Sequence, residues 1–294
     1  MGMDIGLSVY HDNSIESIAL ALSLPTIDGV EVDVRMSADG TLWLFHENLL
    51  ESHTNGVGCV FETTDEVLEK LRYKSLHKEK LARLDQVWPL LGQHKIILDL
   101  KHWNACTEGY VDMQRFKEAL YEIPIQYRAQ ITLDSSNPNW LAALSQDFRV
   151  VFSTVSVEEG LKQLQKVPAL QGLMLRSKDV SQAQILQLQQ MDKDCYLFEL
   201  RSSKKQRAAL QKQPFAILAD DPRGALVIRD WFILCRKVAW PPLPWCLFLW
   251  FQWKFRNRVR CVRFAHSLSQ SQFSYLATSC LKSLYQWRRR SHLK

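Results

Sequence analysis

The 294-residue sequence lacks the features that mark fibrous, disordered and membrane-spanning chains. It has only 11 glycines and 10 prolines, and 47% of its residues are hydrophobic. This composition excludes a collagen-like, low-complexity or disordered chain. No run of about 18 uncharged apolar residues occurs, so we expect no transmembrane helix. Residues 1–6 also lack the basic and apolar regions of a secretory signal peptide.

The seven cysteines form no recognisable pattern. Their number is odd and none of them lies in a CxxC spacing. We therefore expect neither disulfides nor a zinc site, and we expect a reducing, cytoplasmic environment.

Nucleotide-binding loops are missing too, since no GxGxxG or GxxxxGK[ST] sequence follows an apolar run. Short apolar runs instead alternate with segments of helical period. Strands are predicted at Ile5–Tyr10, Gly29–Arg35, Leu42–His46, Lys95–Leu100, Gln130–Leu133, Arg149–Ser153, Gly172–Leu175, Cys195–Leu200 and Phe215–Ala219. About eight β/α units of this kind predict a closed (β/α)8 TIM barrel, with a doubly wound open sheet as the alternative.

The charge is divided unequally along the chain. From residue 225 to the C-terminus there are 13 Lys and Arg and one acid, a net charge of +12, whereas the preceding 224 residues carry −6. The same C-terminal stretch contains six of the ten tryptophans. We therefore expect a barrel domain over residues 1–237 and a basic, Trp-rich extension over residues 238–294.

Polar residues lie at or near the ends of several predicted strands, where barrel enzymes place their active sites. The period-2 pattern of residues 29–35 puts Glu31 and Asp33 on one face of a strand, and Asp99 lies on a later strand. His11 follows another predicted strand, and His46 is the last residue of a further one.

Three carboxylates this close together repel one another unless a cation binds them, and oxygen ligands favour Mg²⁺ or Ca²⁺. Two histidines suit general acid and base catalysis, and Lys101 would neutralise charge on a phosphoryl group. Each of these residues alone is more often a solvated surface residue. Together they indicate a metal-assisted barrel enzyme.

Residues 29–50, GVEVDVRMSADGTLWLFHENLL, carry a more specific pattern. They resemble the glycerophosphodiester phosphodiesterase family, with its G-x-E-x-D-V, x-x-D-G and strand-terminal H-D motifs. Residues 54–60, TNGVGCV, resemble the loop that follows in the family. Asp99-Leu100-Lys101 and Asp220-Asp221-Pro222 resemble its later E-x-K and T-D-x-P motifs.

This resemblance implies hydrolysis of a glycerophosphodiester to glycerol 3-phosphate and an alcohol. It implies that Glu31, Asp33 and Asp99 bind one divalent cation, that His11 and His46 form the acid–base pair, and that Lys101 contacts the phosphate.

The sequence also departs from the family. The usual opening H-R-G is here His11-Asp12-Asn13, so the phosphate-contacting arginine is missing, and Asp99 replaces a glutamate. Two alternatives therefore stay open: a catalytically weak or silent barrel that binds phospholipid headgroups, and a related phospholipase D-like phosphodiesterase.

For residues 238–294 the basic and aromatic composition favours contact with an anionic membrane surface over nucleic acid. No specific nucleic-acid partner is expected. An unselected extension that does not fold explains the composition equally well.

Overall fold

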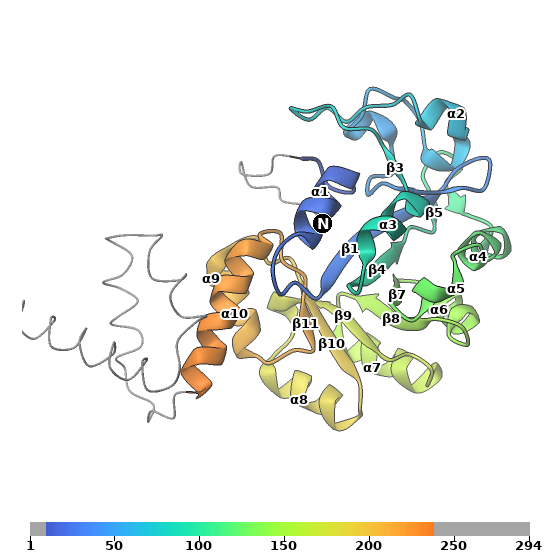
Figure 1. Cartoon of the computed structure of the whole chain (residues 1–294). Coiled ribbons are helices and arrows are strands. Elements are labelled where there is room, and N and C mark those ends of the chain that lie inside the picture. Colours follow the sequence, from blue (N-terminus) through green and yellow to red (C-terminus); the bar gives the residue numbers. More distant parts are fainter. Residues whose placement is uncertain (1–9, 238–294) are drawn as a thin grey trace, which may run out of the picture. The chain divides into compact units, whose positions relative to one another are not determined.

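The computed structural model describes the backbone of residues 10–237 and the side chains of residues 10–230. Within these residues, nine strands form one sheet in the order β11-β10-β9-β8-β7-β4-β1-β2-β3 (Figure 1). Seven of them run parallel: β1 (Gly29–Met36), β4 (Lys95–Leu100), β7 (Ile131–Ser135), β8 (Arg149–Thr154), β9 (Gly172–Arg176), β10 (Asp194–Phe198) and β11 (Ala216–Ile217). Their spatial order follows their order in the chain after β1, as expected for consecutive β/α units.

Helices connect most of the parallel strands. The longer ones are α1 (Ile15–Leu22), α4 (Met113–Tyr121), α6 (Pro138–Leu144), α7 (Val157–Lys166), α8 (Gln182–Gln190), α9 (Ser203–Gln211) and α10 (Pro222–Lys237). Polar side chains at their starts accept hydrogen bonds from backbone N–H groups that the helix itself leaves unpaired. These N-caps are Ser14, Asp112, Asn137, Ser156, Ser181 and Ser202.

The main core lies between the helices and one face of the strands. Val32 and Val34 of β1 and Leu98 of β4 are at most 1% exposed and belong to this core. Because side chains alternate along a strand, the neighbouring residues Glu31, Asp33 and Asp99 face the other way. The same alternation on later strands gives a second, smaller cluster of Val151, Met174 and Tyr196.

Residues 45–83 form a lobe of their own (Figure 1). The short antiparallel strands β2 (Leu42–Leu44) and β3 (Ala82–Arg83) lead into and out of it, and it contains η1 (Leu50–Ser52), η2 (Val60–Glu62) and α2 (Asp65–Leu68). A separate core, formed with Trp43 of β2, holds the lobe together: Trp43, Phe45, Leu50, Val60, Leu68, Leu71, Tyr73 and Leu81. His46 lies at the start of this lobe.

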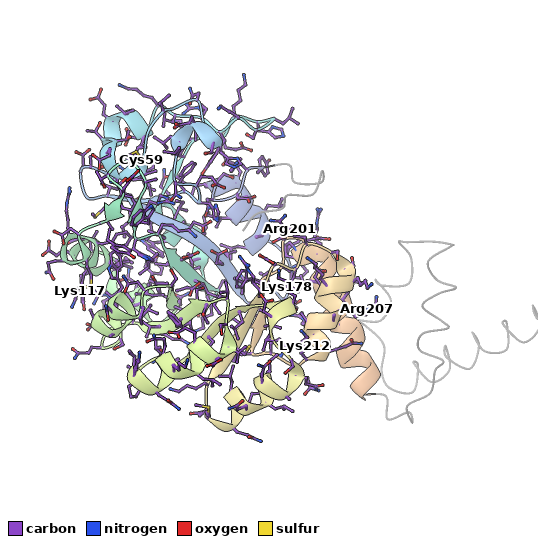
Figure 2. The ribbon with its side chains drawn as sticks, turned by 180° about the vertical axis from the view of Figure 1, so that it is seen from behind. Cys59, Lys117, Lys178, Arg201, Arg207 and Lys212 are labelled. Atoms are coloured by element: carbon purple, nitrogen blue, oxygen red, sulfur yellow. A yellow bond between two sulfur atoms is a disulfide. The ribbon has the colours of Figure 1, made fainter. Side chains whose placement is uncertain are left out.

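Cys59 of the lobe forms a disulfide with Cys106, which lies between the short strands β5 (Trp103–Asn104) and β6 (Gly109–Tyr110). Figure 2 labels Cys59. The prediction that no disulfide forms is therefore wrong. The two cysteines are 47 residues apart, so no local sequence motif predicts their pairing. The fold brings their Cα atoms to 6.0 Å. The expectation of a reducing environment was based on that prediction and is therefore no longer supported by it.

The predicted strands from Gly29–Arg35 onward agree with the structure in order and type, and differ at their ends. Strand 195–200 ends at Phe198, because Glu199 has a positive φ of 60° that interrupts extended backbone. Residues 84–91 form two short helices, η3 (Leu84–Val87) and α3 (Trp88–Leu91). Sequence analysis missed β3, β5, β6 and four further short elements, which are η1, η2, α5 (Ile125–Arg128) and η4 (Ser177–Asp179).

Two predictions fall outside the described residues. Of the predicted first strand Ile5–Tyr10 only Tyr10 is described, and the extension 238–294 is not described at all. By its internal contacts the chain divides between Leu234 and Cys235. The domain boundary near residue 237 and the membrane contact of the extension stay predictions. Among the described helices, none combines the length and hydrophobicity needed to cross a bilayer.

Candidate active site and metal centre

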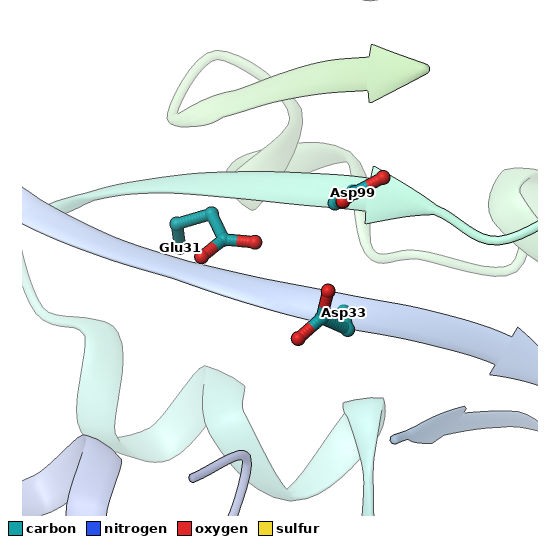
Figure 3. Close-up of side chains that lie close together, drawn as sticks. All are labelled: Glu31, Asp33 and Asp99. Carbon is teal, nitrogen blue, oxygen red and sulfur yellow. The ribbon is translucent and has the colours of Figure 1, made fainter. Parts of the chain in front are cut away.

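Three carboxylates meet where β1 and β4 lie side by side. Asp33 and Asp99 are direct partners in the parallel register of the two strands, and Glu31 lies one pleat earlier on β1. One carboxylate oxygen of each residue lies within 4.8 Å of the others (Figure 3). Sequence analysis predicted this grouping, which follows from strand alternation combined with the parallel register.

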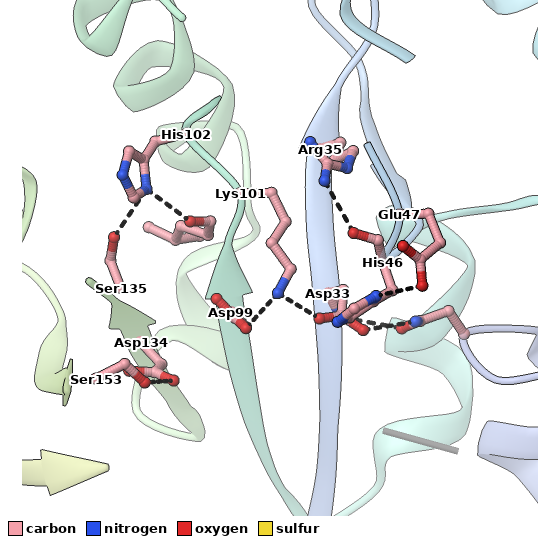
Figure 4. A network of polar contacts seen from close by, with 12 residues as sticks. Asp33, Arg35, His46, Glu47, Asp99, Lys101, His102, Asp134, Ser135 and Ser153 are labelled. Carbon is pink, nitrogen blue, oxygen red and sulfur yellow. Dashed lines mark hydrogen bonds and ion pairs between the residues drawn. The ribbon is translucent and has the colours of Figure 1, made fainter. Parts of the chain in front are cut away.

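Lys101 lies just beyond the end of β4, and its ammonium group lies between two of these carboxylates. Its Nζ is 2.8 Å from Asp33 Oδ1 and 2.6 Å from Asp99 Oδ2 (Figure 4). Burial alone would raise the pKa of Asp33, but the ammonium of Lys101 holds it well below its usual range. The two carboxylates in turn raise the pKa of Lys101, against the effect of burial.

Glu31 has the opposite electrostatic environment. Burial raises its pKa, and the negative charges of Asp33 and Asp99 raise it further. A carboxylate in this setting ionises more readily once a cation is near. The Lys101 ammonium lies on the Asp33 and Asp99 side of the cluster.

Asp134 of β7 extends the acidic row, and sequence analysis missed it. It pairs in register with Asp99, is 3% exposed, and accepts a hydrogen bond of 2.7 Å from Ser153 Oγ to its Oδ2. Its Oδ1 is buried without a hydrogen-bond partner. Burial, followed by the charge of Asp99, raises its pKa well above the usual value. Its position at the end of a predicted strand was the available signal.

The three carboxylates fit a divalent cation by their chemistry. The donor set is all oxygen, the donor atoms converge, and a positive group already lies between two of them. Hard cations such as Mg²⁺ and Ca²⁺ prefer such ligands.

His46 follows β2, and buried groups hold its backbone in place. Arg35, only 3% exposed, donates from Nη2 to the carbonyl oxygen of His46 at 2.8 Å and to Asn48 Oδ1 at 3.0 Å. The imidazole Nδ1 lies 3.0 Å from Glu47 Oε1. An ionised carboxylate only accepts hydrogen bonds, so Nδ1 carries a proton and Nε2 holds the lone pair of the neutral ring.

His11 lies on the lobe. Its ring stacks on that of Tyr73, with centroids 3.8 Å apart, and its backbone N–H donates to Glu79 Oε1 at 3.2 Å. Its Nδ1 lies 2.8 Å from the carbonyl oxygen of Asp12 and its Nε2 lies 3.1 Å from His53 Nδ1. Direct contact with the carboxylate cluster comes two residues later in the chain, from Asn13.

Asn13 is a second residue that sequence analysis missed as part of the site. It is 6% exposed and has a positive φ of 59°. Its Nδ2 donates to Asp33 Oδ2 at 2.8 Å, and its Oδ1 accepts from the backbone N–H of Asp33 at 2.9 Å. It fixes the orientation of one carboxylate of the cluster. Nothing in its local sequence indicated this role.

Comparison with known proteins places this arrangement in a family. The family model of the glycerophosphoryl diester phosphodiesterases matches residues 6–220. A glycerophosphodiester phosphodiesterase of Caldanaerobacter subterraneus subsp. tengcongensis is 30% identical over 95 residues, which are 31% of this chain and 39% of that protein. The aligned stretch thus spans about two fifths of that relative.

Solved structures resemble the chain over a greater length. A phosphodiesterase of Oleispira antarctica, solved with the product sn-glycerol-3-phosphate, has a TM-score of 0.63 at 19% identity, covering 74% of this chain and 91% of that one. A glycerophosphoryl diester phosphodiesterase homologue of Agrobacterium tumefaciens has a TM-score of 0.66 at 12% identity, covering 76% and 94%.

These likenesses confirm the predicted (β/α)8 barrel as the fold class. The match of the family model over residues 6–220 includes all three carboxylates, Lys101 and both histidines of the predicted site. The chain belongs to the glycerophosphoryl diester phosphodiesterase family.

Proposed function

We propose that the chain hydrolyses a glycerophosphodiester to glycerol 3-phosphate and an alcohol, at the site formed by β1, β4 and the lobe. The observation that carries this proposal is the convergence of Glu31, Asp33 and Asp99 with the ammonium of Lys101. Family membership supports the reaction class, and the solved relative with bound sn-glycerol-3-phosphate supports the product class.

Members of this family use a divalent metal. In this chain Glu31, Asp33 and Asp99 would hold it, and their oxygen donors favour Mg²⁺ or Ca²⁺. When bound, such a cation supplies Lewis-acid polarisation of a phosphoryl oxygen. Lys101 provides a second positive charge for the phosphate from the same side of the sheet.

The two histidines take complementary roles. Glu47 holds a proton on Nδ1 of His46, which leaves Nε2 as a general base for the attacking hydroxyl group. A hydroxyl of the glycerol group next to the phosphate serves as the first nucleophile, and water then opens the resulting cyclic phosphodiester to give glycerol 3-phosphate. His11 serves as the general acid and donates a proton to the alkoxide that leaves.

No arginine follows His11, and a barrel that binds the phosphate poorly turns over slowly. This departure from the family is the reason for the alternative function, a barrel that binds phospholipid headgroups without hydrolysing them. The ammonium group of Lys101 lies between Asp33 and Asp99. Phosphate binding therefore depends on Lys101 more strongly than in family members that also have the arginine.

Glycerophosphocholine hydrolysis tests the function. We expect release of glycerol 3-phosphate with added Mg²⁺ or Ca²⁺ and its loss with EDTA. His46→Ala and His11→Ala should each lower kcat by roughly 10²–10⁴. The double variant should be little worse than either single one, because the two residues act as a unit.

His77→Ala is the matched control, because this exposed imidazole contacts the ring of Tyr10 rather than the proposed pair. Binding of glycerophosphocholine without hydrolysis under all metal conditions would favour the silent barrel instead.

A further inference from the structure

A third imidazole lies between the two proposed catalytic histidines. His53 follows η1 in the lobe, and its Nδ1 lies 3.1 Å from Nε2 of His11. On its other side, its Nε2 lies 3.6 Å from Glu47 Oε1, the oxygen that also contacts His46. The chain of contacts therefore runs from His11 through His53 and Glu47 to His46.

The backbone of His53 is held on both sides, so its position is a property of the lobe. Its N–H donates to the carbonyl oxygen of Leu50 at 3.3 Å, and its carbonyl accepts from the N–H of Lys74 at 2.7 Å. The rings of His11 and His53 meet edge to face with centroids 5.0 Å apart. His11 is thereby restrained by Tyr73 on its face and by His53 at its edge.

The polar contacts of the two rings limit where the protons of this pair lie. The outer nitrogen of His11, Nδ1, faces a carbonyl oxygen, and the outer nitrogen of His53, Nε2, faces a carboxylate. The carbonyl oxygen only accepts hydrogen bonds, so Nδ1 of His11 carries a proton. The carboxylate of Glu47, 3.6 Å from Nε2 of His53, favours a proton on that nitrogen by its negative charge. The inner contact between Nε2 of His11 and Nδ1 of His53 is a hydrogen bond only when one further proton lies between them.

We propose that His53 is the proton-sharing partner of His11: the two imidazoles together hold three protons and one positive charge, balanced by Glu47. The proposal rests on the function proposed above for His11. His53 acts through His11 and is therefore a positioning residue, which shares the Nε2 proton of His11 until the leaving group takes that proton.

The proton transfer balances as follows. The leaving alkoxide oxygen replaces His53 Nδ1 as the acceptor of the shared proton. The N–H bond at His11 Nε2 breaks, an O–H bond forms on the alkoxide oxygen, and two neutral imidazoles remain, each with a proton on its outer nitrogen. The side chain of His53 is 47% exposed, so the pair regains its proton from solvent.

Substitutions at position 53 separate this role from packing. His53→Ala should lower kcat roughly tenfold to a hundredfold with little change in KM, because the acid of the reaction loses its orientation. His53→Asn should recover most of the loss, since its amide oxygen accepts a hydrogen bond from protonated Nε2 of His11. His53→Leu fills the space but accepts no hydrogen bond, and should stay as impaired as His53→Ala.

The same substitution in a His11→Ala background connects the effect to His11. There, His53→Ala should cause no further loss of kcat. In full-length wild-type protein the ¹⁵N chemical shifts of the His11 and His53 rings should report one shared proton, and those of His77 should not change when His53 is substituted.

Two results would overturn the proposal: wild-type kcat in His53→Ala while His11→Ala is impaired, or equal recovery by leucine and asparagine. Wild-type kcat in His11→Ala would instead contradict the proposed function of His11 itself, so the two failures are distinguishable.

Discussion

Asn13 and Asp33 are joined by two hydrogen bonds, one to the carboxylate and one to the backbone N–H of the same residue. The two residues are 20 positions apart, and both are at most 6% exposed. Asp33 contacts Lys101 through its other carboxylate oxygen. One carboxylate thus connects the start of α1 with the end of β4, and its orientation depends on an amide that contributes no charge.

Asn13→Gly should weaken binding of Mg²⁺ or Ca²⁺ by about 10–100-fold, because a residue that orients a metal ligand has an effect of this size. Glycine tolerates the positive φ at this position, so the change removes the two hydrogen bonds without adding backbone strain. Isothermal titration with the metal measures the loss. Unchanged affinity in this variant would mean that Asp33 is oriented without Asn13.

Glu31→Gln should abolish turnover and also remove the thermal stabilisation that the metal provides. A ligand that binds only the native state stabilises the wild type by about 2.7 kcal/mol at a concentration of 100 Kd. Thermal unfolding with and without Mg²⁺ or Ca²⁺ checks this. A variant that retains both activity and metal-dependent stabilisation would place the metal elsewhere.

Lys101→Met removes the ammonium between Asp33 and Asp99 while keeping a side chain of similar length. Breaking a buried ion pair costs about 3–5 kcal/mol, so the metal-free variant should unfold at a lower temperature. Added divalent cation should stabilise this variant more than the wild type, because it replaces the lost positive charge.

Hydrolysis should fall by roughly 10²–10³ in Lys101→Met even with metal, because the phosphate loses a positively charged partner. Lys101→Arg, which retains a positive charge, is the control for unfolding temperature. Equal stabilisation of the wild type and the methionine variant by metal would contradict the compensation of charge described for the cluster.

Replacing Cys59 and Cys106 by serine should lower the free energy of unfolding by about 2–4 kcal/mol, since the disulfide closes a long loop. Urea denaturation with and without dithiothreitol measures how much reduction lowers the stability of the wild type. The double variant should have the same stability under both conditions. Cys195, buried and without a disulfide, offers the control: Cys195→Ala should keep the sensitivity to reductant. Insensitivity of the wild type to complete reduction would contradict this role.

Asp65 connects α2 with β2, because Trp43 Nε1 donates to its Oδ1 at 2.8 Å and the Thr41 hydroxyl donates to its Oδ2. Burial opposes ionisation, but hydrogen bonds from Ser37, Thr41 and Trp43 lower its pKa from 3.8. A carboxyl whose folded-state pKa is depressed contributes stability above its unfolded pKa and loses it as the pH falls through its folded pKa.

Asp65→Asn should therefore lower the urea midpoint at pH 7, and the difference from wild type should shrink as the pH falls below about 3.8, the ordinary pKa of this group. Urea denaturation over a series of pH values measures it. A difference independent of pH would show that the charge of Asp65 is not involved.

Much of the fold was predictable because its determinants are local. The alternation in Gly29–Met36 indicated both a strand and the shared face of Glu31 and Asp33. Gly29 itself lies so close to the carbonyl oxygen of Lys95 that any Cβ would clash, which fits the tight pairing of β1 with β4. The ends of elements were less predictable, because residues such as Glu199 adopt a positive φ under tertiary constraint.

The amino-acid sequence by itself determined the order of strands and helices and the residue types of the proposed metal centre, since both depend on periodicity within a few neighbouring residues. Only the tertiary structure decided the partners of these residues. Asn13 meets Asp33 across 20 positions, His53 meets His11 across 42, and Cys59 meets Cys106 across 47. Such contacts depend on how the lobe packs and how the parallel strands align, and no local pattern records that geometry.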